Sequence, residues 1–179
     1  MEAPFGMPLG RLLPLDGTAA VLVGGYHGTW IPAARAARLT LTTGTSGTSG
    51  TRGTRGTTGT GVLAVLPADR CGLTETARVL RYLALQSAGQ CGPCLNGLPR
   101  IAAAFRTLAA PGPQGTARHN VARWAGLAEG RRACHHPDGT VRLARSALTT
   151  FATELDAHAQ GLCTTTDPTP LLPVPEETP

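Results

Sequence analysis

The sequence predicts an α+β fold, in which a small β-sheet in the first part of the chain is followed by a four-helix bundle. Short runs of aliphatic and β-branched residues, bounded by glycines, occur before residue 70 and are typical of strands. From residue 71 onward, apolar residues recur every three or four positions, which is typical of amphipathic helices. With 179 residues and 41% hydrophobic residues, the chain can bury a core.

Two strands and a short helical piece are predicted in the first part. The piece covers residues 9–13, and the first strand runs over residues 19–23 until it ends at a Gly-Gly pair. The second strand, VLAVL, covers residues 62–66. We therefore assign residues 1–39 and 62–68 to one sheet-forming domain.

Two segments have compositions that do not support a core. Residues 40–61 consist almost wholly of Thr, Gly and Ser, so we expect a flexible linker that has too few apolar side chains to offset its ordering entropy. Residues 163–179 are rich in proline and lack periodicity, so we expect a disordered tail.

The helical domain is expected to cover residues 69–162. Its first helix begins after Cys71, with Thr74 as the predicted N-cap and Glu75 favourably placed in the first turn. The second begins near Cys94 and reaches Ala109, where a Pro/Gly segment ends it. The third covers residues 117–129, and the fourth is an unbroken stripe over residues 139–160. Four such helices with short connections predict a bundle.

Charge and composition exclude several functions. The formal net charge is +5, but the basic residues do not alternate with aromatics, which make up only 4%, so nucleic-acid binding is not expected. No run of 18 apolar residues exists, and the first residues do not read as a secretory signal. We therefore expect a protein of the reducing cytoplasm with no membrane span, where five cysteines point to metal binding or catalysis.

Three cysteines occur in matching settings. Cys91 and Cys94 lie in the turn CGPC before the second helix, and Cys134 lies in a turn before the fourth. Two turns at helix starts can come together in a bundle and bring their thiolates to one inorganic centre. Helix N-termini also favour the negative charge of a thiolate-bound cluster. Zinc held by these thiols with His135 or His136, a thioredoxin-like pair, and purely structural cysteines stay open as alternatives.

The stretch SAGQCGPCLNG resembles the iron–sulfur binding region of the flavoprotein F subunit of NADH-quinone oxidoreductase (respiratory complex I) and related hydrogenase and formate dehydrogenase subunits. That pattern is S-C-G-x-C-x-P-C-R-x-G, with a further Cys about 40 residues on that opens a helix. The matching positions are Ser87, Gly89, Cys91, Pro93, Cys94, Gly97 and, as the distant ligand, Cys134. PFGMPLGRLL and VLVGGYHGTW resemble the family's soluble-ligand-binding (SLBB) β-grasp domain.

The resemblance implies a small SLBB-like β-grasp piece before the bundle, and an iron–sulfur cluster, of 4Fe-4S type, held by Cys91, Cys94 and Cys134. Ala88 occupies the place of the family's first cysteine, and a methyl group cannot bind iron. The main candidates for the missing ligand are Cys71 and His135, and the further options are His136, Asp138 or water. A helix of about 14 residues between Cys71 and the CGPC turn, roughly 20 Å long, argues against Cys71.

These observations predict an electron-transfer module that exchanges single electrons with a flavoprotein or ferredoxin-like partner. Nothing in the sequence resembles the family's FMN- and NADH-binding region, so we expect FMN and NADH only through a partner chain and no NADH oxidation by this chain alone. The alternative is a non-redox interaction or ligand-binding protein whose bundle is zinc-bound or metal-free. His158 is predicted to be a core-edge histidine, and Cys163 a free bystander.

Overall fold

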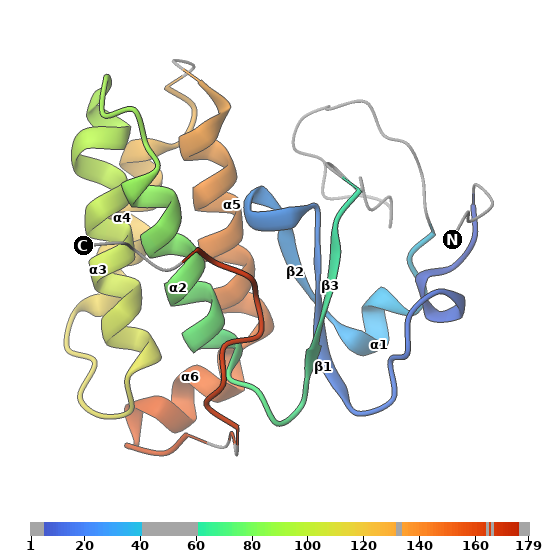
Figure 1. Ribbon diagram of the computed structural model, residues 1–179. Coiled ribbons are helices and arrows are strands. Elements are labelled where there is room, and N and C mark those ends of the chain that lie inside the picture. Colours follow the sequence, from blue (N-terminus) through green and yellow to red (C-terminus); the bar gives the residue numbers. More distant parts are fainter. Residues whose placement is uncertain (1–5, 41–60, 132–133, 164, 166, 176–179) are drawn as a thin grey trace.

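The computed structural model describes residues 6–40, 61–131, 134–163, 165 and 167–175. Most of the predicted linker, residues 41–60, lies outside the described residues. The α+β class is confirmed: a three-stranded antiparallel sheet lies beside a group of helices (Figure 1). The strands are β1 (Thr18–Val23), β2 (Thr29–Pro32) and β3 (Leu63–Pro67). The helices are η1 (Leu9–Arg11), η2 (Gly25–His27), α1 (Ala33–Ala36), α2 (Gly72–Leu85), η3 (Pro93–Gly97), α3 (Leu98–Ala109), α4 (Ala117–Ala128), α5 (His135–Thr150) and α6 (Ala152–Ala159).

Strand β1 is the middle strand and divides two cores. It pairs with both neighbours, so that Val21 lies opposite Ile31 of β2 and Val65 of β3. Because side chains alternate along a strand, Ala20 and Leu22 face the helices, while the neighbouring valines face a smaller core with η1 and α1. Strand β2 was not predicted, since it has only four residues between a glycine turn and Pro32.

The sheet is joined to the helices mainly through β2 and α5, which lie side by side in Figure 1. The Trp30 N–H donates to Ser146 Oγ at 3.0 Å, and the Thr150 hydroxyl donates to the Trp30 carbonyl at 3.0 Å. The buried Trp30 ring meets Phe151 edge-on, with centroids 5.4 Å apart. These side chains of α5 satisfy the backbone of an edge strand that would otherwise be unpaired on that side.

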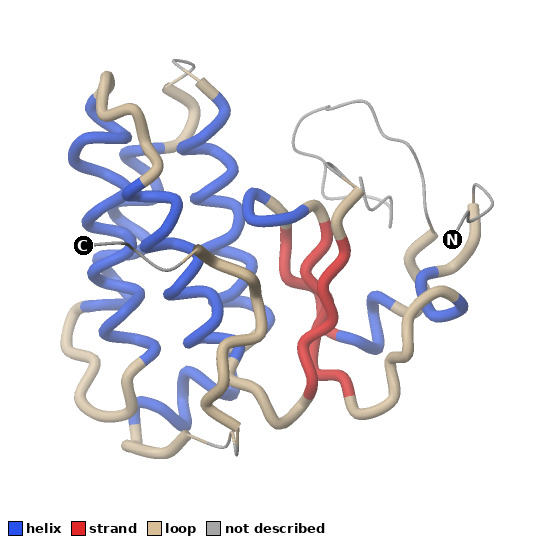
Figure 2. Tube along the Cα trace, viewed as in Figure 1, coloured by secondary structure: helices blue, strands red, loops and turns tan. Residues whose placement is uncertain are grey.

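The four longer helices, coloured blue with the other helices in Figure 2, are α2, α3, α4 and α5. Helix α2 contacts α3 and α5, α3 contacts α4, and α4 contacts α5. Their common core contains Leu80, Ile101, Phe105, Val121 and Leu143, all fully buried. None of the helices in the described part of the chain is long and apolar enough to cross a bilayer. The finer assignments, a four-helix bundle and an SLBB-like β-grasp piece, stay predictions.

The start of α2 differs from the prediction. Its N-cap is Cys71, not Thr74: the Cys71 sulfur accepts a hydrogen bond from the Thr74 N–H at 3.3 Å. Thr74 lies inside the first turn of the helix, so the predicted N-cap is wrong by three residues. Sulfur is a weak acceptor and is not among the preferred capping residues, which is why the hydroxyl of Thr74 was the natural choice from sequence.

The last predicted helix is two helices. Helix α5 begins at His135, earlier than the predicted residue 139, and the chain departs from helical geometry at Phe151, with φ −106° and ψ 31°. The Phe151 ring packs against Trp30 and covers Gly72 so closely that a Cβ at residue 72 would lie 2.3 Å from it. The packing of the Phe151 ring coincides with the break between α5 and α6, although the apolar period of the sequence continues through Phe151.

The described part of the C-terminal segment is not disordered as predicted. Residues 167–175 run along α2, in the dark red trace of Figure 1, and Leu172 is 4% exposed in the main core. The backbone N–H groups of Leu171 and Leu172 donate to the Glu75 carboxylate at 3.2 and 2.8 Å. Arg70 forms an ion pair with Asp167 at 2.6 Å. Hydrogen bonds to α2 and an ion pair with the loop before α2 hold this segment in place, and no periodicity in its own sequence indicates that position.

Candidate functional site

The CGPC turn leads directly into α3 through η3, a single π-helical turn. Pro93 is the first residue of that turn, where its missing N–H costs no hydrogen bond, and Cys94 is the second. The Leu95 N–H donates to the Cys91 carbonyl at 2.9 Å, which fixes the turn. Cys94 is 4% exposed, whereas Cys91 is half-buried. Single π turns are frequent at functional sites because they reorient side chains within a helix.

Cys134 is the N-cap of α5 and is exposed. Its side chain makes no capping hydrogen bond, so the sulfur is not used by the helix. The Asp138 carboxylate, in the first turn of α5, accepts a hydrogen bond from the Gly130 N–H at 2.8 Å. This bond joins the residue after α4 to the start of α5, while the Cys134 thiol stays available.

The three thiols lie near one another. Burial first, and then the neighbouring thiols of Cys91 and Cys134, raise the pKa of Cys94 to about 11. The two turns are therefore neighbours in the fold, although Cys94 and Cys134 lie 40 residues apart in sequence. Negative charge on either neighbour opposes ionisation of the Cys94 thiol, and a bound cation reverses that effect.

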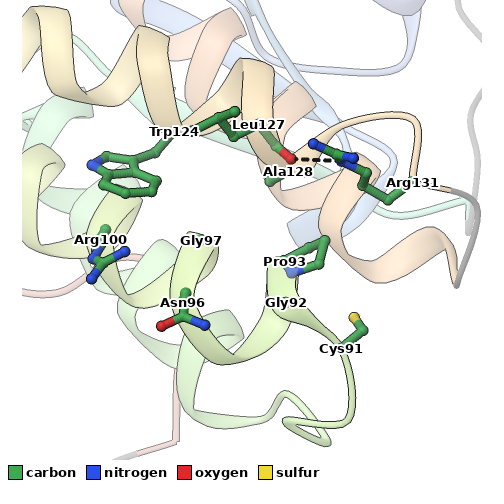
Figure 3. A pocket seen from close by; sticks show the side chains of 10 residues that line it. All are labelled: Cys91, Gly92, Pro93, Asn96, Gly97, Arg100, Trp124, Leu127, Ala128 and Arg131. Atoms are coloured by element: carbon green, nitrogen blue, oxygen red, sulfur yellow. Dashed lines mark hydrogen bonds between the residues drawn. The ribbon is translucent and has the colours of Figure 1, made fainter.

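A pocket of about 530 Å³ adjoins this group (Figure 3). Cys91 lies at one end, and Trp124 and Arg100 lie at the other. The Arg100 guanidinium lies 4.4 Å from the centroid of the Trp124 ring, a cation–π contact. Arg131, at the rim, donates from Nε to the Leu127 carbonyl at 3.1 Å. The pocket therefore carries positive charge at its rim and at the end opposite Cys91.

Other polar groups near the start of α5 are mostly engaged. His136 contacts the Leu83 carbonyl through Nε2 at 2.9 Å and the His27 ring through Nδ1 at 3.0 Å, so neither nitrogen is available as a ligand. The His135 ring is exposed and has no hydrogen-bond partner among the described residues. His135 is consequently better placed to act as an additional ligand than His136.

The structure places Cys71 elsewhere. It caps the start of α2, and that 14-residue helix, about 21 Å long, separates it from the CGPC turn. Its sulfur lies with a ring nitrogen of His158 and the sulfur of Cys163, all within 4.8 Å of one another. The sequence analysis did not link these three residues, because they come from separate segments and follow no ligand spacing. Ala88 is exposed in the loop that follows α2.

Comparison with known proteins bears on the helical part of the chain. Residues 74–158 match the family described as the NADH-ubiquinone oxidoreductase-F iron-sulfur binding region. This stretch contains Cys91, Cys94 and Cys134. The family match confirms the predicted resemblance and the iron–sulfur cofactor, and it lies in the domain where the three thiols meet.

A solved structure shares the fold of the iron–sulfur binding region and of the sheet before it. It is described as the NAD+-reducing [NiFe]-hydrogenase in the H2-reduced state, and it matches with a TM-score of 0.71 and 23% sequence identity. The match covers 88% of this chain and 27% of that one, so the chain spans about a quarter of that protein's length. At this identity the likeness shows the fold alone. No curated protein matches the sequence.

Proposed function

We propose that this chain is an electron-transfer module that holds an iron–sulfur cluster through Cys91, Cys94 and Cys134, as the F-subunit family does. The observation that supports the proposal is that the Cys91 and Cys134 thiols, from two separate turns, both lie near enough to Cys94 to raise its pKa. A bound cluster supplies a centre that gains and loses single electrons. The residues of the chain supply the sulfur ligands, the surrounding charge and the degree of exposure, which together set the potential.

The ligand set differs from four cysteines. Three thiolates can bind three irons of a 4Fe-4S cluster, and Ala88 supplies nothing to the fourth. His135, next to Cys134, has an exposed ring with no hydrogen-bond partner in the described part of the chain, and it supplies the fourth ligand or leaves that place to water. Cys71 has no part in this proposal, because it lies at the other end of α2.

The surroundings suit an anionic centre. Cys94 and Cys134 lie at the starts of η3 and α5, where free N–H groups and the positive end of the helix dipole stabilise negative charge. Arg100 and Arg131 add positive charge at the pocket. Since Cys91 is half-buried and Cys134 exposed, a partner can come close to the cluster from this side.

The partner in this proposal is a flavoprotein or ferredoxin-like redox protein with an acidic surface, which complements the arginines around the pocket. We propose that FMN and NADH chemistry reaches this chain through that partner. The proposal places the protein in the reducing cytoplasm, where thiolates stay free to bind metal.

The test is anaerobic reconstitution of the full chain with iron and sulfide. Loaded protein is expected to be brown, with broad absorbance near about 400 nm and stoichiometric iron and sulfide. Cys94→Ser should abolish the colour, because it removes the ligand between the other two. Cys163→Ser is the matched control, since it makes the same change outside the three-thiol group and should keep the cluster.

Two results would overturn the proposal. Iron retained by Cys94→Ser at the wild-type level would place the cluster elsewhere. Wild-type protein that takes up zinc but no iron and sulfide would favour a non-redox metal site at these thiols.

A further inference from the structure

A second group of metal-ligating side chains lies at the start of α2. Cys71 precedes α2, His158 lies on α6, and Cys163 follows α6. One donor atom from each lies within 4.8 Å of the other two, and Cys71 Sγ is 3.7 Å from His158 Nε2. Cys71 and His158 are buried, at 7% and 0% exposed, while Cys163 lies at the surface. The three residues form a pocket of soft donors closed on the inner side and open at one edge.

The His158 ring is oriented as a metal ligand requires. Its Nδ1 is 3.2 Å from the Leu108 carbonyl, which can only accept, so Nδ1 carries the proton and donates. Nε2 is therefore unprotonated and directs its lone pair toward the Cys71 sulfur. A backbone carbonyl that fixes one nitrogen of a histidine in this way is the usual second contact of a metal-bound imidazole.

Two further groups face the Cys71 sulfur. The Thr74 N–H donates to it at 3.3 Å, an arrangement that stabilises a thiolate at a helix start. Burial, and then the nearby carboxylate of Glu154, one helical turn before His158, raise the pKa of Cys71. One Glu154 oxygen, Oε1, is buried and accepts no hydrogen bond among the described residues. A buried carboxylate beside a thiol is costly without a cation between them.

We propose that Cys71, His158 and Cys163 bind a zinc ion, and that the Glu154 carboxylate, which lies near Cys71 but outside the group of three, turns in as the fourth ligand. In tetrahedral zinc sites, sulfur and nitrogen donors lie roughly 3.6 Å apart and two sulfurs roughly 3.8 Å apart. The Cys71–His158 distance already fits, and rotation of the exposed Cys163 closes the remaining gap of at most about 1 Å. Binding deprotonates both thiols and releases two protons to solvent.

The donor types favour zinc over other common cations. Two thiolates and an imidazole suit zinc, whereas magnesium and calcium prefer oxygen ligands. Two sulfurs from this chain are too few for the usual ligation of an iron–sulfur cluster, so this site is chemically distinct from the one at Cys94. A closed site with four protein ligands is structural, and here it ties α6 and the segment after it to the start of α2.

The experiment isolates this site from the other thiols. Full-length protein carrying Cys91→Ser and Cys94→Ser is titrated under reducing conditions with Co²⁺, a spectroscopic substitute for Zn²⁺, and then with Zn²⁺ in competition. We expect one Co²⁺ per chain, with the intense visible bands of a tetrahedral thiolate site, and displacement by Zn²⁺. Because the double variant cannot form the three-thiol group, this result does not depend on the proposed electron-transfer function.

Matched variants assign the ligands. In the same background, Cys163→Ser should weaken metal binding by about 100-fold, since a structural zinc site divides its binding free energy among four ligands. His119→Gln is the control, because it removes another exposed metal-binding side chain outside both proposed sites and should leave the affinity unchanged. Zn²⁺ should raise the melting temperature of the control and not that of the Cys163 variant, which also shows that both are folded.

Three results would overturn the inference. The first is that the background protein binds no Co²⁺, and the second is that Cys163→Ser leaves the affinity unchanged. The third is a Cys71–Cys163 disulfide, seen as a loss of two mass units under non-reducing conditions, in a protein that still takes up no metal after reduction.

Discussion

The buried carboxylate of Glu75 gives the sharpest test of how the C-terminal segment is held. It is 4% exposed and accepts hydrogen bonds from the Leu171 and Leu172 N–H groups. Arg78, one turn later in α2, donates to both of its oxygens at 3.0 Å. The perturbation is Glu75→Ala, which removes the acceptor for the segment and the partner of Arg78 together.

The expected loss in the free energy of unfolding is about 2–4 kcal/mol. Hydrogen bonds to a charged group contribute about 1.5–3 kcal/mol each, so two of them set the upper range. The loss is limited if the segment detaches, because the freed N–H groups then bind water. The remaining cost is that Leu172 is no longer buried, which is worth about 2 kcal/mol. Arg78 adds little, since its side chain is 28% exposed and can be solvated.

Urea denaturation and limited proteolysis measure this effect. Glu75→Ala should lower the free energy of unfolding and expose the peptide bonds around Leu172 to cleavage. Glu129→Ala is the matched control: its ion pair with Arg145, at 2.5 Å, is nearly half exposed, so its loss should be about 0–1 kcal/mol with no new cleavage. A variant at Glu75 that behaves like this control would refute the reasoning.

Two further predictions concern the joints between the sheet and the helices. Gly72→Ala should cost about 1–3 kcal/mol in thermal or urea denaturation, because the added Cβ would lie 2.3 Å from the Phe151 ring; an unchanged stability would contradict the packing described. Burial, and then the nearby His136 and Arg142, lower the pKa of His27 below 6.5, so the unfolded chain takes up a proton before the folded one. The free energy of unfolding should therefore fall as the pH drops below 6.5, and His27→Gln should flatten that slope in urea titrations between pH 5 and pH 8, a range of about three units around the ordinary histidine pKa.

Local pattern in the sequence was sufficient for much of the fold and for the thiol group. The helix predicted at residues 117–129 is found as α4, Ala117–Ala128, since its apolar period and its terminal glycine are local signals. Two turns that each open a helix predict that Cys91, Cys94 and Cys134 lie together, and the thiols of Cys91 and Cys134 both lie near enough to Cys94 to raise its pKa. Their role as cluster ligands stays a prediction.

Contacts between distant segments decided the rest. The break at Phe151 coincides with the packing of its ring over Gly72 and against Trp30, which are neighbours that the local sequence does not contain. The N-cap at Cys71 is a local contact with the Thr74 N–H, but its acceptor is a sulfur, which is not among the preferred capping groups. Strand β2 is too short to be recognised without the partner strand β1 and the hydrogen bonds from α5.

By itself, the sequence determined which residues are apolar, which segments are helical and which thiols stand near helix starts, because these depend on neighbours within a turn or two. Only the tertiary structure brought His158 and Cys163 to Cys71 and placed Leu172 in the core. Such groupings arise from the packing of whole helices, where a side chain's surroundings are set by residues almost a hundred positions away, and no spacing in the sequence records them.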